Sequence, residues 1–143
     1  MTSGSTFPQR LTKIDPLTIR DHHYLGPTDE CYFLGEYTAR RGYSHSTTNQ
    51  LIFNFKKSPL KRGMAQWRYK ETAIAQAGAA FAAALNVDWL KVATLVPLPP
   101  SKARTDPLYD DRVTQMLRSI RSHSPLDIRE MILQNQSTRP PTT

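Results

Sequence analysis

The sequence predicts an α/β domain with a parallel sheet, and three segments carry this prediction. Residues 69–86 are dominated by alanine, the best helix former. Residues 92–98, Val-Ala-Thr-Leu-Val-Pro-Leu, form a continuous apolar run that favours a strand buried on both faces. A third segment opens at Asp110 and repeats apolar residues at helical spacing. Helices arranged around a buried strand are typical of the α/β class.

The composition is that of one soluble domain. The chain has 143 residues, of which 38% are hydrophobic and 22% charged. No apolar run reaches the ~20 residues that span a bilayer, and the first residues lack the pattern of a signal peptide. One cysteine, Cys31, excludes an internal disulfide and a cysteine-rich zinc site. We therefore expect a cytoplasmic protein without a membrane partner.

The charge balance favours anionic partners without identifying one. The formal net charge is +7 and the isoelectric point is about 9.8. An excess of positive charge attracts polyanions and phosphorylated molecules. A basic surface that serves only solubility is the alternative.

The N-terminal third predicts an arm followed by a short strand. Residues 1–20 mix proline, serine, threonine and basic side chains without periodicity, so we expect a flexible arm. Residues 31–37, Cys-Tyr-Phe-Leu-Gly-Glu-Tyr, are rich in β-formers and predict a strand.

The stretch 48–57 predicts a helix. Leu51, Ile52 and Phe55 share a helical face, and Thr47 and Gln50 have the spacing of a capping box. A strand through residues 51–53 is the alternative, and the cap favours the helix.

A basic stretch with interleaved aromatic residues follows this helix. Such a pattern can bind nucleic acid through phosphate contacts and base stacking. The competing interpretation is a solvated basic loop whose tryptophan packs on the core, since no nucleic-acid-binding motif accompanies the stretch. The candidate nucleic-acid residues are Lys56, Lys57, Lys61, Arg62, Trp67, Arg68 and Lys70.

The helix at residues 69–86 carries a strip of small side chains on one face. Ala73, Ala77, Ala80 and Ala84 make up the strip, which allows a neighbouring element to approach closely. Asn86 is expected to end the helix. The apolar strand 92–98 follows, and Pro97 marks its C-terminal end because proline cannot donate within a sheet.

The loop after the strand is the predicted anion site. Ligands of open α/β sheets bind beyond the carboxyl ends of the parallel strands. Ser101 supplies a hydroxyl there, and Lys102 and Arg104 supply positive charge. The next helix carries Val113, Met116, Leu117 and Ile120 on one face, with Asp106 or Asp110 as its predicted cap. The competing interpretation is a crossover loop with solvated charges.

This region resembles the phosphoribosyltransferase-like proteins, in particular the ComF-type branch and its relatives. The residues that carry the resemblance are Val-Pro-Leu-Pro-Pro-Ser-Lys-Ala-Arg at 96–104 and Tyr-Asp-Asp-Arg at 109–112. In that group a strand ending in Val-Pro-x-Pro leads into a basic loop and a helix. Residues 49–57 are similar to the short helix and lysine that precede the group's first crossover helix. Residues 133–138 are similar to the segment that enters its hood region, so the resemblance spans residues 31–138.

The resemblance implies a doubly wound parallel sheet that binds phosphoribosyl pyrophosphate, usually with Mg²⁺. It places the pyrophosphate loop at Ser101, Lys102, Ala103 and Arg104. The family also carries two acidic residues on a later strand, followed by a Thr- and Gly-rich loop for the 5-phosphate. This sequence has no such segment, because residues 110–111 are followed by Arg-Val-Thr-Gln without a glycine.

The expected organisation is therefore half of such a domain. It comprises an arm at 1–20, one incomplete domain at 21–136 and a disordered tail at 137–143. The sheet is partial, with a short N-terminal strand-and-helix extension. We expect no activity alone, no identifiable catalytic residue, and Mg²⁺ only where a partner chain completes the site. No metal site is expected either, because the adjacent His22 and His23 would point apart in a strand.

Overall fold

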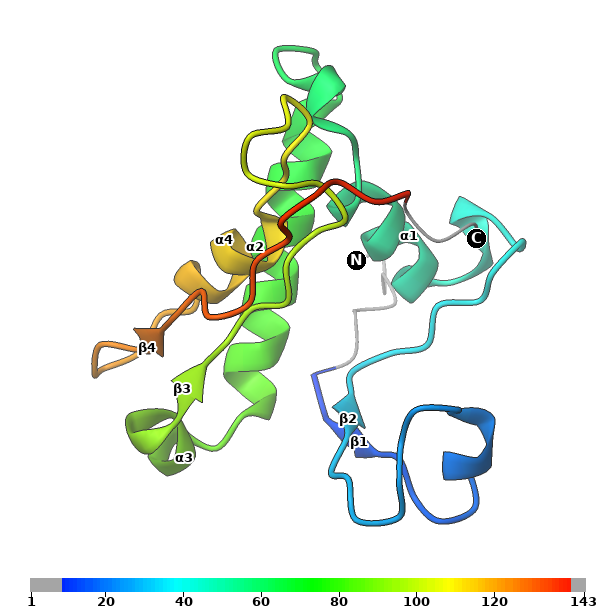
Figure 1. Ribbon diagram of the computed structural model, residues 1–143, viewed down its shortest axis with the longest axis vertical. Helices are drawn as coiled ribbons and strands as arrows, with labels where there is room; N and C mark the ends of the chain where they lie inside the picture. Colours follow the sequence, from blue (N-terminus) through cyan, green and yellow to red (C-terminus); the bar gives the residue numbers. More distant parts are fainter. Residues whose placement is uncertain (1–8, 140–143) are drawn as a thin grey trace, which may run out of the picture.

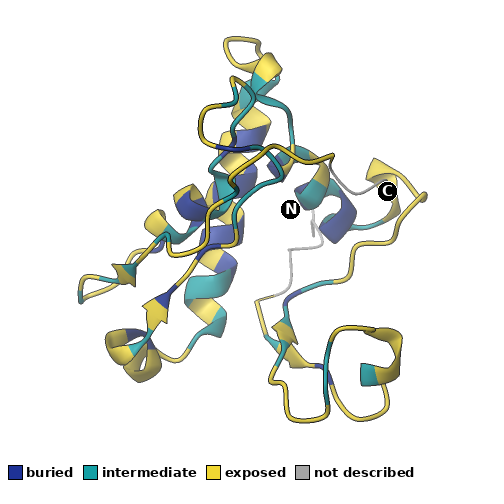
Figure 2. Ribbon diagram, viewed as in Figure 1, coloured by how far each residue is buried: buried dark blue, intermediate teal, exposed yellow. Residues whose placement is uncertain are grey.

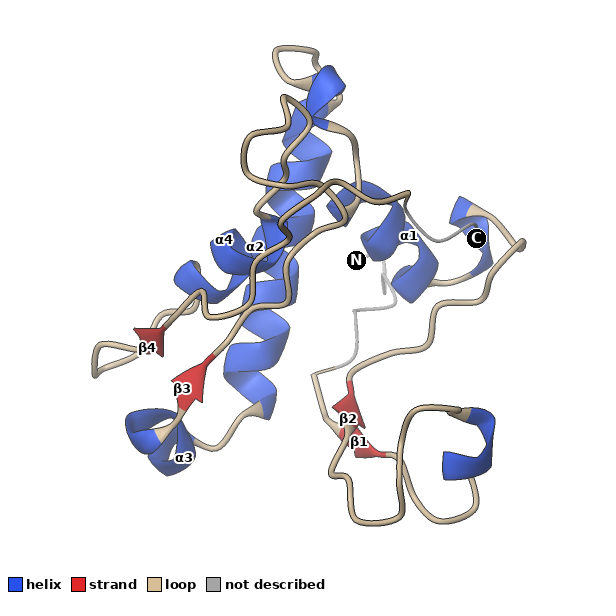
Figure 3. Cartoon of the chain, in the orientation of Figure 1, coloured by secondary structure: helices blue, strands red, loops and turns tan. Residues whose placement is uncertain are grey.

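The computed structural model describes residues 9–139, which form a mixed α/β arrangement with little strand (Figures 1 and 3). The helices are α1 (Thr47–Phe55), α2 (Trp67–Ala84), α3 (Val87–Val92) and α4 (Arg112–Arg118). The strands are β1 (Thr12–Lys13), β2 (Tyr32–Phe33), β3 (Thr94–Leu95) and β4 (Asp127–Ile128). Three short 3-10 turns lie at Ile19–Asp21, Tyr43–His45 and Pro59–Lys61. Across residues 9–139 no helix has the length and apolarity needed to cross a membrane.

The core forms where α1 and α4 pack against α2, the long helix in the middle of Figure 1. The buried faces of these three helices turn toward one another (Figure 2). Burial of apolar side chains at helical spacing is what stabilises short helices such as these. The buried members of this cluster are Leu51, Phe55, Ala73, Ile74, Ala77 and Met116.

Helix α1 confirms the predicted helix and excludes the alternative strand at residues 51–53. Its first turn is capped by Ser46, whose Oγ accepts a hydrogen bond of 3.0 Å from the Asn49 backbone N–H. The predicted capping pair of Thr47 and Gln50 is therefore wrong by one residue. Both interpretations used the same chemistry, a hydroxyl three residues before a free N–H.

Helix α2 confirms the predicted alanine-rich helix and begins two residues earlier, at Trp67. Ala73, Ala77 and Ala80 are buried, as the small-residue strip predicts, whereas Ala84 is only half-buried. At Gly78 the two helices lie in close contact, since an added Cβ atom would be 3.0 Å from the Met116 carbonyl oxygen of α4. The small residues thus allow α4 to lie directly against α2.

The strands form two separate pairs. β1 and β2 are antiparallel, with Thr12 opposite Phe33, while β3 and β4 are parallel, with Thr94 opposite Asp127. The described chain has no doubly wound parallel sheet, so the fold class is confirmed only as mixed α/β. Two residues in each strand provide too few ladder bonds to extend a sheet.

The predicted strand at 92–98 is corrected in length and in burial. Only Thr94 and Leu95 pair, and Val92 belongs to α3. Leu95 is buried, but Leu98 is 67% exposed, so the run is not buried on both faces. Continuous hydrophobicity was a misleading signal, because one face of this strand lacks a covering layer.

Two further elements differ from the predictions. The predicted end of α2 at Asn86 is wrong by two residues, because the helix ends at Ala84 and Leu85 is its C-cap. The Asn86 Oδ1 instead accepts hydrogen bonds from the backbone N–H groups of Asp88 and Trp89 and thereby caps the unpredicted α3. Helix α4 confirms the predicted helix, yet neither Asp106 nor Asp110 caps it. Asp111 occupies the N-cap position, and its side chain accepts no hydrogen bond from a backbone N–H of the first turn.

The N-terminal region is more ordered than predicted. Residues 1–8 of the predicted arm lie outside the described residues. In the rest of the arm, β1 pairs with β2 and Ile14 is buried. The predicted strand 31–37 is reduced to Tyr32–Phe33. The predicted tail begins with Ser137 and Thr138, which bond to the main fold, and residues 140–143 lie outside the described part.

Candidate functional site

The four predicted anion-site residues lie in one loop between β3 and α4. The loop begins at the carboxyl end of β3 and leads into α4. The chain then returns to β4, which is parallel to β3. Its backbone is folded by local turns: Ala103 accepts a hydrogen bond of 2.9 Å from the Asp106 N–H, and Asp106 accepts one from the Leu108 N–H. The β3–loop–α4–β4 unit thus positions the loop as the sequence predicts.

A C-terminal segment crosses this loop, and we call residues 130–138 the covering segment. The Ser101 carbonyl accepts a hydrogen bond of 2.7 Å from the Thr138 N–H. The Ala103 N–H donates to Ser137 Oγ at 3.0 Å, and that hydroxyl donates to Asp106 Oδ2 at 2.7 Å. The Ala103 N–H, a donor that could contact an anion, is therefore already bonded within the chain.

The Ser137 hydroxyl also lowers the pKa of the Asp106 carboxyl group in the loop. Its hydrogen bond, followed by the one from the Leu108 N–H and by the charge of Lys102, lowers the pKa of Asp106 below the ordinary value. An ionised carboxylate next to Lys102 reduces the local positive potential. An incoming anion would meet this negative charge.

The covering segment neutralises the second cation of the loop. Arg104 forms an ion pair with Glu130, whose other oxygen accepts a hydrogen bond of 2.9 Å from Thr114 Oγ1. Thr114 is buried on α4, so Glu130 is held from both sides. Lys102 makes no ion pair with any described residue and is the loop cation that remains available.

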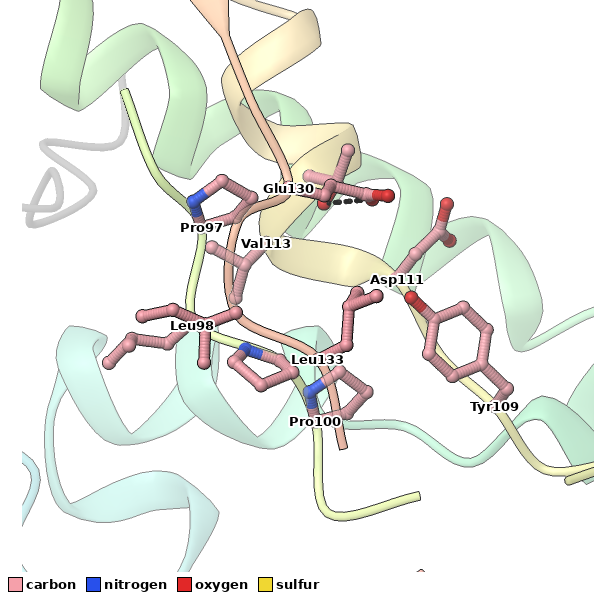
Figure 4. Close-up of a pocket in the computed structure, with 11 residues that line it drawn as sticks. Pro97, Leu98, Pro100, Tyr109, Asp111, Val113, Glu130 and Leu133 are labelled. Carbon is pink, nitrogen blue, oxygen red and sulfur yellow. Dashed lines mark hydrogen bonds between the residues drawn. The ribbon is translucent and has the colours of Figure 1, made fainter. Parts of the chain in front are cut away.

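The space beside the loop is small. Pro97, Leu98 and Pro100 face Tyr109, Val113 and Glu130 around a cavity of about 10 Å³ (Figure 4). That volume holds about one water molecule. A phosphate or pyrophosphate must therefore bind on the open side of the loop, or displace the covering segment.

The candidate nucleic-acid residues divide into exposed and buried groups. Lys56, Lys61, Arg62 and Arg68 are exposed. Arg62 lies 5.5 Å above the Trp67 ring, and Arg68 lies 4.9 Å above the Tyr69 ring. Trp67 is half-buried, at the start of α2, so it belongs to a helix and not to a loop.

Lys70 does not belong to the candidate nucleic-acid surface, because its side chain is only 1% exposed. Its ammonium donates to the carbonyls of Phe55 and Lys57 at 2.8 and 2.7 Å and to Asp110 Oδ2 at 2.6 Å. Arg112 also contacts that carboxylate, at 3.0 Å. Desolvation lowers the pKa of Lys70, against the opposing effect of Asp110. The Lys70 ammonium therefore bonds to groups inside the protein and is not available to a ligand at the surface.

The sequence contained a signal for this buried lysine. Lys70 stands three, four and seven residues before Ala73, Ile74 and Ala77, which places it on the apolar face of α2. A lysine on such a face needs a buried acceptor. Asp110 supplies the carboxylate, so the acid also contributes to joining the loop to the core.

The described chain contains no cluster of three His, Cys, Asp or Glu side chains suited to a metal ion. His22 and His23 are exposed, and Cys31 is a half-buried free thiol. Comparison of the sequence and fold with protein-family models, curated proteins and solved structures finds no match.

Proposed function

We propose that this chain is half of a phosphoribosyltransferase-like domain whose loop at residues 101–104 binds pyrophosphate or a phosphate group. The observation that carries the proposal is the parallel β3–loop–α4–β4 unit, with a basic loop at the carboxyl end of β3. The finer fold that we propose is a partial doubly wound sheet. Another chain would complete it.

The proposed unit has no activity alone. Phosphoryl-type substrates require several donors and usually a metal held by carboxylates. Asp110, the buried acid nearest the loop in sequence, is already paired with Lys70 and Arg112. The residues at 9–139 therefore do not fit Mg²⁺, and in this proposal a completing chain supplies the metal ligands.

Calorimetric titration with pyrophosphate tests the proposal. Replacing Lys102 and Arg104 with glutamine is expected to abolish binding, because those side chains provide the loop's positive charge. The Arg118→Gln/Arg121→Gln double variant removes the same charge from exposed positions outside the loop and is the matched control. Equal loss in both double variants would show that only net charge matters and would contradict the proposal.

Glu130→Gln provides a second arm of the same test. This change removes the carboxylate that neutralises Arg104, so the affinity for pyrophosphate is expected to rise. Unchanged affinity would mean that Arg104 does not contact the ligand.

A second candidate function is binding of nucleic acid by the exposed basic stretch. The observation that favours it is the placement of Arg62 and Arg68 over aromatic rings, with no acidic partner within the described chain. Neutralising Lys61, Arg62 and Arg68 together is expected to remove salt-dependent binding of an oligonucleotide. Loss on neutralising Lys102 and Arg104 instead would oppose this candidate.

A further inference from the structure

A cleft formed by α1 and the chain segments before and after it brings together cationic and aromatic side chains. Its cavity volume is about 540 Å³, within the range of ~300–1,000 Å³ typical of small-molecule sites. Lys56, Lys57 and Lys61 line it, together with Tyr37, Tyr43 and Phe53. None of its lining residues is acidic, so no carboxylate inside the cleft neutralises the lysines.

The aromatic walls of the cleft remain accessible. Tyr43 is 48% exposed and Phe53 is 58% exposed, and their rings meet edge to face at a centroid distance of 5.4 Å. The Lys57 ammonium lies 5.4 Å from the Phe53 ring centroid and 5.8 Å from that of Tyr69. A planar ring that stacks on these walls would remove apolar surface from water close to positive charge.

Asn49 holds the two walls at a fixed separation. Its side chain is 1% exposed, and its Oδ1 accepts a hydrogen bond of 2.9 Å from the Thr38 N–H. Its Nδ2 donates to the carbonyls of Thr38 and Gly42, at 2.9 and 3.0 Å. Gly42 has a φ of 79°, a conformation that disfavours other residues. The wall that carries Tyr43 is thus anchored to α1 before any ligand arrives, which lowers the entropy cost of binding.

We propose that this cleft binds a nucleoside phosphate, with the base against Tyr43 or Phe53 and the phosphate among Lys56, Lys57 and Lys61. The combination of exposed rings, three cations and no acid matches a ligand that joins a planar ring to an anion. The source is either a free mononucleotide or one unit of a single strand. The proposal deepens the nucleic-acid candidate, because it shares three lysines with it, and it is independent of the loop at residues 101–104.

Titration with AMP, adenosine and inorganic phosphate tests the proposal. AMP is expected to bind at least about tenfold more tightly than adenosine or phosphate, since base stacking and charge act together in AMP and only one of them acts in each fragment. In a two-dimensional NMR spectrum, AMP should shift the amide signals of Tyr43, Phe53 and Lys57. Equal affinity for AMP and phosphate would contradict a role for the rings.

Variants on exposed positions distinguish the cleft from general electrostatics. Lys56→Gln/Lys61→Gln and Tyr43→Leu are each expected to weaken AMP binding about tenfold, with thermal unfolding curves confirming that both variants fold. The Arg118→Gln/Arg121→Gln variant removes two charges elsewhere and should change affinity less than about twofold at moderate salt. Equal weakening by the control would overturn the proposal.

An oligothymidylate titration identifies the source of the ligand and separates the two hypotheses. Binding of the oligonucleotide that is lost in Tyr43→Leu supports the single-strand source, even where AMP binds weakly. Binding that survives in Tyr43→Leu, but is lost when Arg62 and Arg68 are neutralised, retains the nucleic-acid candidate and overturns the cleft. Absence of binding by both AMP and oligothymidylate overturns both.

Discussion

At the scale of single residues, the buried ammonium of Lys70 is the group on which the junction of α1, α2 and the loop depends. The ammonium donates to three acceptors, and all three lie outside α2, the helix that carries Lys70. Two of them are the backbone carbonyls of Phe55 and Lys57, at the C-terminal end of α1, where helical carbonyls have no partner within the helix. The third is the carboxylate of Asp110. One side chain therefore satisfies two carbonyls at the end of α1 and shares the Asp110 carboxylate with Arg112.

Replacing Lys70 with methionine is expected to lower the free energy of unfolding by about 3–5 kcal/mol, because it leaves a buried carboxylate and two carbonyls without this donor. Chemical denaturation measures the loss. Lys56→Met, which removes an exposed ammonium from the end of α1, is the control and should change stability by less than about 0.5 kcal/mol. Similar losses in the two variants would contradict the assigned role of Lys70.

The hydrogen bond between Ser137 and Asp106 predicts a change in a carboxyl pKa. Ser137→Ala removes the largest cause of the lowered pKa of Asp106, so that pKa is expected to rise toward 3.8. Because the folded-state pKa is lowered, the stability contribution of this carboxylate is present above pH 3.8 and is lost as the pH falls through the folded value. Ser137→Ala should therefore reduce the loss of stability on acidification.

NMR titration of the Asp106 carboxyl carbon measures this pKa directly. Thr105→Ala, at an exposed neighbouring position, is the control and should leave it unchanged. An unchanged pKa in Ser137→Ala would mean that the covering segment does not lie on the loop in solution.

At the scale of elements, the contact of α2 with α4 depends on the absence of a side chain at Gly78. A Cβ atom there would lie 2.1 Å from Ser119 Oγ and 3.0 Å from the Met116 carbonyl oxygen. The serine hydroxyl can rotate away, but it then loses its hydrogen bond of 2.6 Å to the Met116 carbonyl. The backbone oxygen can move only with α4.

Gly78→Ala is therefore expected to destabilise the protein by about 1–3 kcal/mol, although alanine favours helix formation by about 1 kcal/mol. Adding Ser119→Gly should recover part of the loss, since it removes the nearest clashing atom. Ala79→Gly, on the exposed side of the same helix, reports the propensity effect alone. A stabilising Gly78→Ala would show that the helices lie further apart than described.

The helices could be predicted where the residues of the helix itself favour helical structure. The alanines of α2 and the apolar face of α4 encode both helices locally, and the buried alanine strip correctly indicated a close contact. The lengths of the strands could not be predicted in this way, because they depend on pairing partners that are distant in sequence. Thr94 of β3, for example, pairs with Asp127 of β4. The covering segment was missed for the same reason, since Glu130 and Ser137 contact a loop some 30 residues earlier in the chain.

At the scale of the whole molecule, the helical core is closed whereas the parallel strand pair is open. Parallel sheets normally have helices on both faces and neighbouring strands on both sides. Here β3 has β4 as its partner within the described chain, and several apolar residues that flank the two strands are exposed (Figure 2). The exposed apolar side chains near the pair are Val92, Val96, Leu98, Met131, Ile132 and Leu133.

An apolar surface beside unpaired strand edges favours association of copies of the chain. We expect sedimentation velocity to show a species that grows with protein concentration. Leu98→Ser/Leu133→Ser should shift the distribution toward monomer, because both leucines are at least half exposed at the open pair, at 67% and 52%. Leu17→Ser/Leu60→Ser removes two leucines of similar exposure from other parts of the surface, at 85% and 68%, and should leave the distribution unchanged. A wild-type monomer at every concentration would show that the strand pair needs no partner, and would count against the half-domain proposed above.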